Sequence, residues 1–208
     1  MIGIFYKDIV SSKLSYFLTV IISLVIIFYA ISQHQTIFIP FLFVYLPIIL
    51  TGVAFTVEEQ SSNIKFILTT PISHTTYVKS KYIFTLCFSF LEYISSLVVF
   101  KDQFGNLQTP SLIGALVFSL PIIITSIQIP CILKFGAEKG RIIMVATYFG
   151  LFALSNLLSD KLEVIISKLQ NIGMSYAYLV TAGICLSILM IMAISIKIGT
   201  LIVQYKEY

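Results

Sequence analysis

The stretch "IFIPFLFVYLPIILTGVAFTV", from Ile37 to Val57, decides how this chain folds. It contains no charged residue and is long enough to cross a bilayer, which takes about 20 apolar residues in a helix. Inside the hydrocarbon no water pairs with the backbone, so the segment must satisfy its own N–H and C=O groups as an α-helix. The stretch therefore predicts a membrane-spanning helix.

Five further stretches have the same character, and the 208-residue chain is 58% hydrophobic but only 11% charged. Soluble domains are roughly a quarter charged, so the composition predicts a polytopic membrane protein of the all-α class. The first span is longer than the apolar core of a signal peptide, and we expect it to be retained. No linker divides the spans, which predicts one transmembrane domain over residues 1–208. The six spans run approximately over residues 14–31, 37–57, 82–100, 112–133, 142–158 and 174–196.

The positions of Lys and Arg predict the orientation. An even number of spans places both termini on one side, and cytosolic segments of membrane proteins are enriched in positive charge. With cytosolic termini, ten of the 13 basic residues lie inside, whereas Lys101, Lys161 and Lys168 lie outside. We therefore expect both termini in the cytosol. The net charge of +4 does not indicate a nucleic-acid partner, because the basic residues are scattered singly at the ends of the spans.

The longest cytosolic segment in this topology covers residues 58–81. It opens with two adjacent acids, Glu58 and Glu59, and continues as "NIKFILTTPISHTTYVKSK". A connector between two spans needs only a few polar residues. The length and pattern of this segment therefore indicate a structural element of its own.

Two helices are predicted within the segment. Ile64, Ile67 and Leu68 share one face of the first helix. Pro71 ends that helix, and Ser73 can cap a second helix that runs into the third span. On this pattern the first helix either rests among lipid headgroups or docks on a cytosolic partner, and both interpretations are open.

The segment resembles the corresponding part of the small membrane subunits of ABC-2 type exporters. Members carry a Pro-Ile/Val-Ser sequence, a few residues and then a Lys before their third span. The usual Arg after the Ser is His74 here, and the Gly often found in the short helix is absent. The residues that match the motif are Pro71, Ile72, Ser73 and Lys81. The motif is confined to this segment, whereas the similarity in topology covers the whole chain.

The resemblance implies a six-helix permease of a bacterial plasma membrane, which pairs with a second copy or a paralogue. It docks on separate ABC ATPase subunits that bind ATP and Mg²⁺, so the chain itself is expected to hold no cofactor, metal or catalytic residue. The short helix would be a coupling helix seated in a groove of the ATPase. Small six-span members include a permease of the staphylococcal phenol-soluble modulin exporter, which suggests a hydrophobic or amphipathic cargo such as a peptide. The implied docking residues are Glu58, Glu59, Ile64, Ile67, Leu68, Pro71 and Ser73.

Polar residues follow one face of the third span. Spacings of four, three and four place them on the same side of a helix. These residues are Thr85, Ser89, Glu92 and Ser96. A carboxylate at that depth is costly against lipid, so Glu92 is expected to face protein or a wet cavity. It either lines a translocation path with Gln128 of the fourth span or forms a hydrogen bond between helices. Candidate partners for that bond are Gln128, Ser15, Thr19 and Ser23.

The last external connection contains "SDKLEVIISKLQ", in which apolar residues recur at helical spacing. Asp160 is placed to cap this helix, and Glu163 follows three residues later. We therefore predict an amphipathic helix over residues 160–170 at the outer surface. It serves either as a lid over the exit or as a linker.

The sequence contains no enzyme motif. A GxxxxGK[ST] phosphate loop is absent, so the energy for transport must come from a partner subunit. HExxH and GxSxG are absent, and His34 and His74 fall on opposite sides of the membrane, where they cannot share a metal. A competing function is that of a non-transporting resistance or immunity protein. A transporter driven by ion gradients would need more buried ionisable groups than Glu92 alone.

Overall fold

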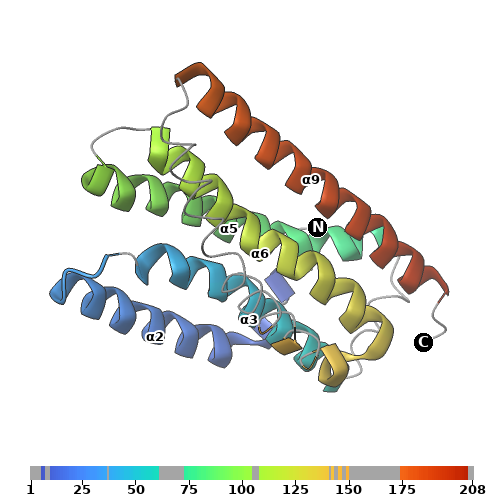
Figure 1. Cartoon of the computed structure of the whole chain (residues 1–208). Coiled ribbons are helices and arrows are strands. Elements are labelled where there is room, and N and C mark those ends of the chain that lie inside the picture. The colour runs from blue at the N-terminus through green and yellow to red at the C-terminus, as the bar shows by residue number, and fades with distance from the viewer. Residues whose placement is uncertain are drawn as a thin grey trace.

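The computed structural model describes residues 6–7, 10–36, 38–60, 73–104, 108–140, 142, 145–146, 149 and 174–205. Its five long helices are α2 (Lys13–Ser32), α3 (Phe38–Gln60), α5 (His74–Phe104), α6 (Gln108–Phe135) and α9 (Met174–Tyr205) (Figure 1). Each is long and apolar enough to cross a membrane, and the described residues contain no strand. The all-α polytopic fold class is therefore confirmed.

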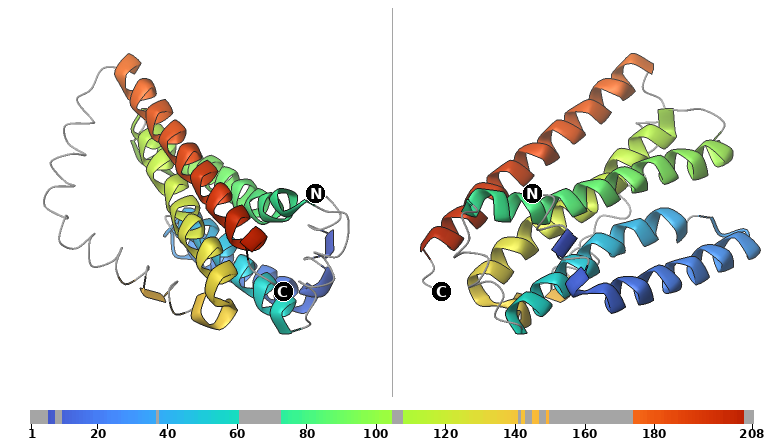
Figure 2. Two further views of the ribbon diagram at one scale, coloured as in Figure 1. Left: turned by 90° about the vertical axis from the view of Figure 1, so that its right-hand side faces the viewer. Right: turned by 180° about the vertical axis from the view of Figure 1, so that it is seen from behind.

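The five helices occupy the first, second, third, fourth and sixth predicted spans. The short helix of the loop after α3, most of the fifth span and the external helix over 160–170 lie outside the described residues. The count of six spans and the cytosolic termini therefore stay predictions. Helices α2, α3, α5 and α6 alternate in direction, whereas α6 and α9 run the same way (Figures 1 and 2). Helix α6 therefore ends at the opposite end of the bundle from the one where α9 begins.

One end of the bundle carries most of the basic side chains, and we call it the basic end. Here α3, α6 and α9 end and α5 begins (Figure 1). Lys79, Lys81 and Lys134 lie close to these helix ends, whereas Lys101 lies near the opposite end of α5. This distribution agrees with the one that the positive-inside rule predicts for a cytosolic side.

Helix α6 occupies the centre of the bundle. It packs against α3, α5 and α9, whereas α2 packs mainly against α3. Of the span residues, 67% are buried in α6 but only 6% in α2. Lipid tails are as apolar as these side chains, so the exposed apolar surface of α2 carries no penalty in a bilayer.

A cluster of nine buried side chains joins the helices at the basic end. It draws on α3, α5, α6 and α9 and on the segment that follows α6. Its members are Phe55, Tyr77, Val78, Tyr82, Ile129, Ile132, Leu133, Ala137 and Val203. Three of them, Tyr77, Tyr82 and Ala137, also take part in the polar contacts described below, so apolar packing and polar contacts act at the same place.

Two glycines let helices approach closely. A Cβ at Gly114 of α6 would lie 2.5 Å from Oγ of Ser96 and 3.2 Å from the ring of Tyr93, both on α5. A Cβ at Gly199 of α9 would lie 3.2 Å from a side chain of α5. Small residues at such contacts are typical of helix packing in membranes. Gly183 of α9 differs, because no described atom lies within 4 Å of its Cβ position.

Replacing Gly114 by Val should destabilise the protein, because the added side chain must displace Ser96 and Tyr93 at a tight contact. Overpacking of this kind costs about 1–3 kcal/mol. The measurement is the melting temperature in mild detergent. Gly183→Val is the matched control, since the same change there meets no described atom, and it should not lower the melting temperature. Equal losses in the two variants would contradict the close α5–α6 contact.

Candidate functional site

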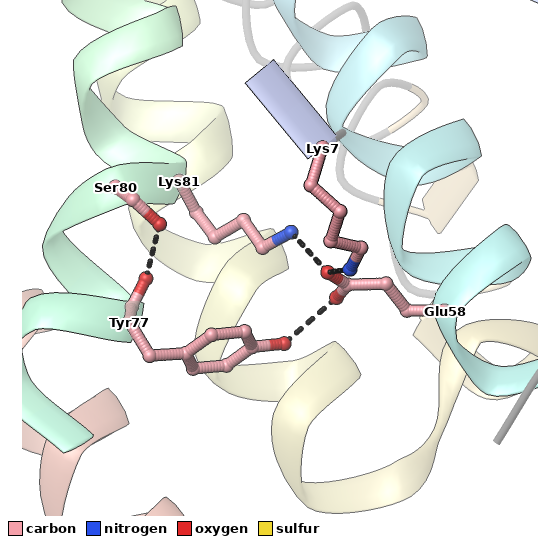
Figure 3. A network of polar contacts seen from close by, with 5 residues as sticks. All are labelled: Lys7, Glu58, Tyr77, Ser80 and Lys81. Carbon is pink, nitrogen blue, oxygen red and sulfur yellow. Dashed lines mark hydrogen bonds and ion pairs between the residues drawn. The ribbon is translucent and has the colours of Figure 1, made fainter. Parts of the chain in front are cut away.

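The side chain of Glu58, in the last turn of α3, lies at the basic end among three other polar groups (Figure 3). Its Oε1 is 2.6 Å from Nζ of Lys7 and 2.8 Å from Nζ of Lys81. Its Oε2 accepts a hydrogen bond of 2.8 Å from the hydroxyl of Tyr77. Only 1% of the Glu58 side chain is exposed. The carboxylate is therefore paired with groups of its own chain.

These partners reach the carboxylate from different parts of the chain. Tyr77 and Lys81 lie one turn apart on α5, so their side chains project from the same face. The Lys81 side chain is 2% exposed, and its ammonium lies 5.0 Å from the centre of the Phe55 ring, within cation–π range. Lys7 precedes α2. The contact thus joins the N-terminal segment, α3 and α5.

The next residue, Glu59, makes a second connection. Its Oε2 accepts a hydrogen bond of 2.6 Å from the backbone N–H of Ala137, which opens a helical turn after α6. An acidic acceptor is favourable at the start of a helical turn. Gly136, with φ of +90°, ends α6 in the left-handed region that glycine tolerates. A Cβ there would lie 2.7 Å from Oε1 of Glu59, so the glycine also leaves room for the carboxylate.

The start of α5 is capped as predicted. Oγ of Ser73 accepts a hydrogen bond of 3.2 Å from the backbone N–H of Thr76, which is the geometry of an N-cap. Helix α5 then begins at His74 and runs without a break to Phe104. The predicted second helix of the loop is therefore the first part of the third span.

The docking residues predicted from the sequence have different outcomes. Glu58 and Glu59 were expected to offer charge to a partner protein, but in the structure both carboxylates bind within the chain. Glu58 is withdrawn from the surface, whereas Glu59 and Ser73 are exposed. The remaining predicted docking residues lie outside the described part of the chain: Ile64, Ile67, Leu68 and Pro71. The docking role of the whole set stays a prediction.

The polar face of α5 is buried in the bundle. Thr85, Ser89, Glu92 and Ser96 are each fully inaccessible. Ser96 lies against Gly114, so this face points toward α6. Gln128 of α6 is also buried, and its Nε2 lies 3.4 Å from the carbonyl oxygen of Ile48 on α3. The predicted path residues thus lie in the interior, and their role in translocation stays a prediction.

Neither carboxylate oxygen of Glu92 has a hydrogen-bond partner among the described residues, and the hydroxyls of Thr85 and Ser89 also have none there. The hydroxyls of Thr19 and Ser23, which were candidate partners, donate instead to carbonyls one turn earlier in α2. A hydrogen bond to these two residues therefore does not account for the burial of Glu92. A buried polar group without a partner is costly, so the burial of Glu92 needs an explanation.

Sequence reasoning missed a polar contact that joins three helices. The hydroxyl of Tyr82 on α5 lies 2.5 Å from Oγ of Ser195 on α9. Ser195 donates its own proton to the backbone carbonyl of Ser126 on α6, so Tyr82 must be the donor to Ser195. Tyr82 and Ser195 lie 113 positions apart, and no sequence pattern relates them.

A bundle of apolar helices with a buried polar face and one basic end defines a multi-pass membrane protein. The family model for the ABC-2 family transporter protein matches residues 3–199, and the chain belongs to this family. It is accordingly the permease component of an ABC transporter and works with an ABC ATPase subunit. The resemblance to ABC-2 type permeases found in the sequence is thereby confirmed, whereas the similarity to the phenol-soluble modulin exporter stays a prediction. Comparison with the curated proteins gave no match, and comparison with the solved structures gave none.

Replacing Glu58 by Gln should destabilise the protein strongly, because the buried ammonium of Lys81 loses its counter-charge. Removing one partner of a buried ion pair costs about 3–5 kcal/mol. The measurement is the melting temperature in mild detergent. Glu59→Gln is the matched control, since the same change falls on an exposed side chain and weakens one hydrogen bond, at a cost of about 1 kcal/mol. Similar losses in both variants would show that the ion pair of Glu58 is unimportant.

Replacing Glu92 by Leu should raise the melting temperature, because it removes two buried oxygens that have no partner among the described residues. Removing a buried polar group that has no partner stabilises a protein by about 1–3 kcal/mol. Glu58→Leu, which removes a paired carboxylate, should act in the opposite direction. A clear loss of stability in Glu92→Leu would show that its carboxyl makes a stabilising contact.

Proposed function

We propose that this protein is the permease subunit of an ATP-driven exporter, and that the loop over residues 58–81 carries a coupling helix that docks on the ATPase. ATP and Mg²⁺ bind to the ATPase subunits. Closure of two ATPases displaces the loop, and the loop tilts the membrane helices between inward-facing and outward-facing arrangements.

The observation that carries this proposal is the attachment of the loop at both ends. Glu58 links the end of α3 to α5 through Lys81, and Glu59 links it to the segment after α6. Ser73 caps the start of α5. A displacement of the loop is therefore transmitted to α3 and α5 together, because separating them would leave buried charges unpaired.

The permease is proposed to act as a pair, with a second copy or a paralogue. Family membership supports this pairing. Helices α2 and α9 both present apolar side chains at their surfaces, among them Phe17 and Phe28 on α2 and Leu186 and Met190 on α9. Such faces can pack against a second permease within the bilayer.

The cargo is proposed to be hydrophobic or amphipathic, and the resemblance to a peptide exporter points to a peptide. The proposed path follows the polar face of α5. Glu92 would bind a cationic group of the cargo, because its carboxylate has no hydrogen-bond partner among the described residues. This face is closed against α6 here, so cargo binding requires α5 and α6 to separate.

Replacing both Ile67 and Leu68 by Asp should abolish co-purification of an ABC ATPase, because charge is then placed on the apolar face predicted to enter its groove. The measurement is affinity purification of the tagged permease from host membranes, with ATPases identified by mass spectrometry. The double variant Ser62→Asp with Thr69→Asp is the matched control, since it places the same two charges on the opposite side of the predicted helix.

The control variant should retain the ATPase, and all variants should remain inserted in the membrane. Undiminished association of the ATPase with the double variant would contradict the docking role. If no ATPase co-purifies even with the unmodified permease, the result favours the alternative of a non-transporting resistance or immunity protein.

A further inference from the structure

A groove lies between the first turns of α5 and the last turns of α9, at the basic end of the bundle. Its volume is about 500 Å³, within the range of about 300–1,000 Å³ that is usual for ligand sites. Two lysines line it, Lys79 from α5 and Lys197 from α9. Its apolar wall is formed by α9, through Ala193, Ile196 and Leu201.

The charges of these two lysines are not balanced within the described part of the protein. Both side chains are exposed, and neither makes an ion pair or hydrogen bond with a described residue. Lys81, on the same helix as Lys79, is by contrast buried against Glu58. Two ammonium groups that line one groove repel each other, so an anion between them is favourable.

The groove changes from charged to apolar along α9. Ala193 lies one turn before Lys197, on the side toward the middle of the helix. Beyond it, α9 exposes further apolar side chains such as Leu189 and Met190. A soluble anion would use only the charged end of the groove. A phospholipid fits both parts, with its phosphate at the lysines and an acyl chain along α9.

We propose that this groove binds an anionic phospholipid of the leaflet at the basic end, with the phosphate between Lys79 and Lys197. Each basic residue near a membrane surface enriches acidic lipid about five-fold over the bulk. Because the groove is shared by α5 and α9, the bound lipid strengthens the contact between these helices. This inference rests on the groove and does not depend on the cargo or on ATPase docking.

The chain contains no Trp, which allows a single fluorescent reporter to be introduced. Ala193→Trp places an indole on the apolar wall of the groove. The protein is reconstituted into phosphatidylcholine vesicles that contain a small fraction of brominated phosphatidylglycerol, which quenches Trp on contact. Brominated phosphatidylglycerol should quench more than the same fraction of brominated phosphatidylcholine. The difference should correspond to an enrichment of the acidic lipid at the groove of about five-fold for each lysine. Replacing Lys79 and Lys197 by Gln should remove this preference, and equal quenching by the two lipids in the parent would overturn the proposal.

Lys134→Gln is the matched control for Lys79→Gln. Lys134 lies at the same end of the bundle but lines a different groove, between α6 and α9. The preference should persist in Lys134→Gln and fall about five-fold in Lys79→Gln. If the two variants behave alike, the attraction belongs to the basic end as a whole and the proposed site is wrong. If inorganic phosphate abolishes the preference and chloride at the same ionic strength does not, the groove binds soluble anions and the lipid assignment is wrong.

Native mass spectrometry of the protein without the Trp reporter provides a second measurement. Released from micelles that contain equal amounts of phosphatidylglycerol and phosphatidylcholine, the protein should retain phosphatidylglycerol. The variant with Lys79→Gln and Lys197→Gln should lose it. Retention of phosphatidylglycerol by that variant, or equal retention of both lipids by the parent, would overturn the proposal and leave an acidic protein surface as the better candidate occupant.

Discussion

The carboxylate of Glu58 is buried where the N-terminal segment, α3 and α5 meet, and the arrangement of the basic end depends on its ion pairs. A buried carboxylate is unfavourable alone, and the buried ammonium of Lys81 is equally so. Each makes the burial of the other tolerable, and the Tyr77 hydroxyl binds the second carboxylate oxygen. Separation of α3 from α5 would leave both charges without partners. The pair therefore fixes how these two helices meet.

This constraint explains how a short loop could control the membrane helices. The segment after Glu59 and before Ser73 is attached at each end to a helix, and α3 and α5 are attached to each other. Helix α5 also carries the buried polar face with Glu92, about five turns from its start. A partner that binds the loop therefore acts on α5, the helix that lines the proposed path. One continuous helix, α5, therefore connects the proposed docking site to the proposed path.

The sequence was sufficient to predict the spans that the structure describes, because a bilayer demands long apolar helices. It also predicted the cap at Ser73 and the shared burial of the polar face of α5, since both follow from local spacing. The partners of Glu58 could not be predicted, because Lys7 and Lys81 lie 51 and 23 positions away and helix packing alone brings them together. Two adjacent acids before a loop are equally compatible with an external and an internal role. For the same reason, no spacing rule relates Tyr82 to Ser195 or Lys79 to Lys197.

The most direct test of the central claim is a double-mutant cycle between Glu58 and Lys81. The free energy of unfolding is measured in mild detergent for the parent, Glu58→Gln, Lys81→Gln and the double variant. Because both single changes break the same contact, the double variant should lose about 1–3 kcal/mol less than the sum of the single losses. Losses that add to within about 0.5 kcal/mol would show that the two charges are not coupled, and would contradict the account.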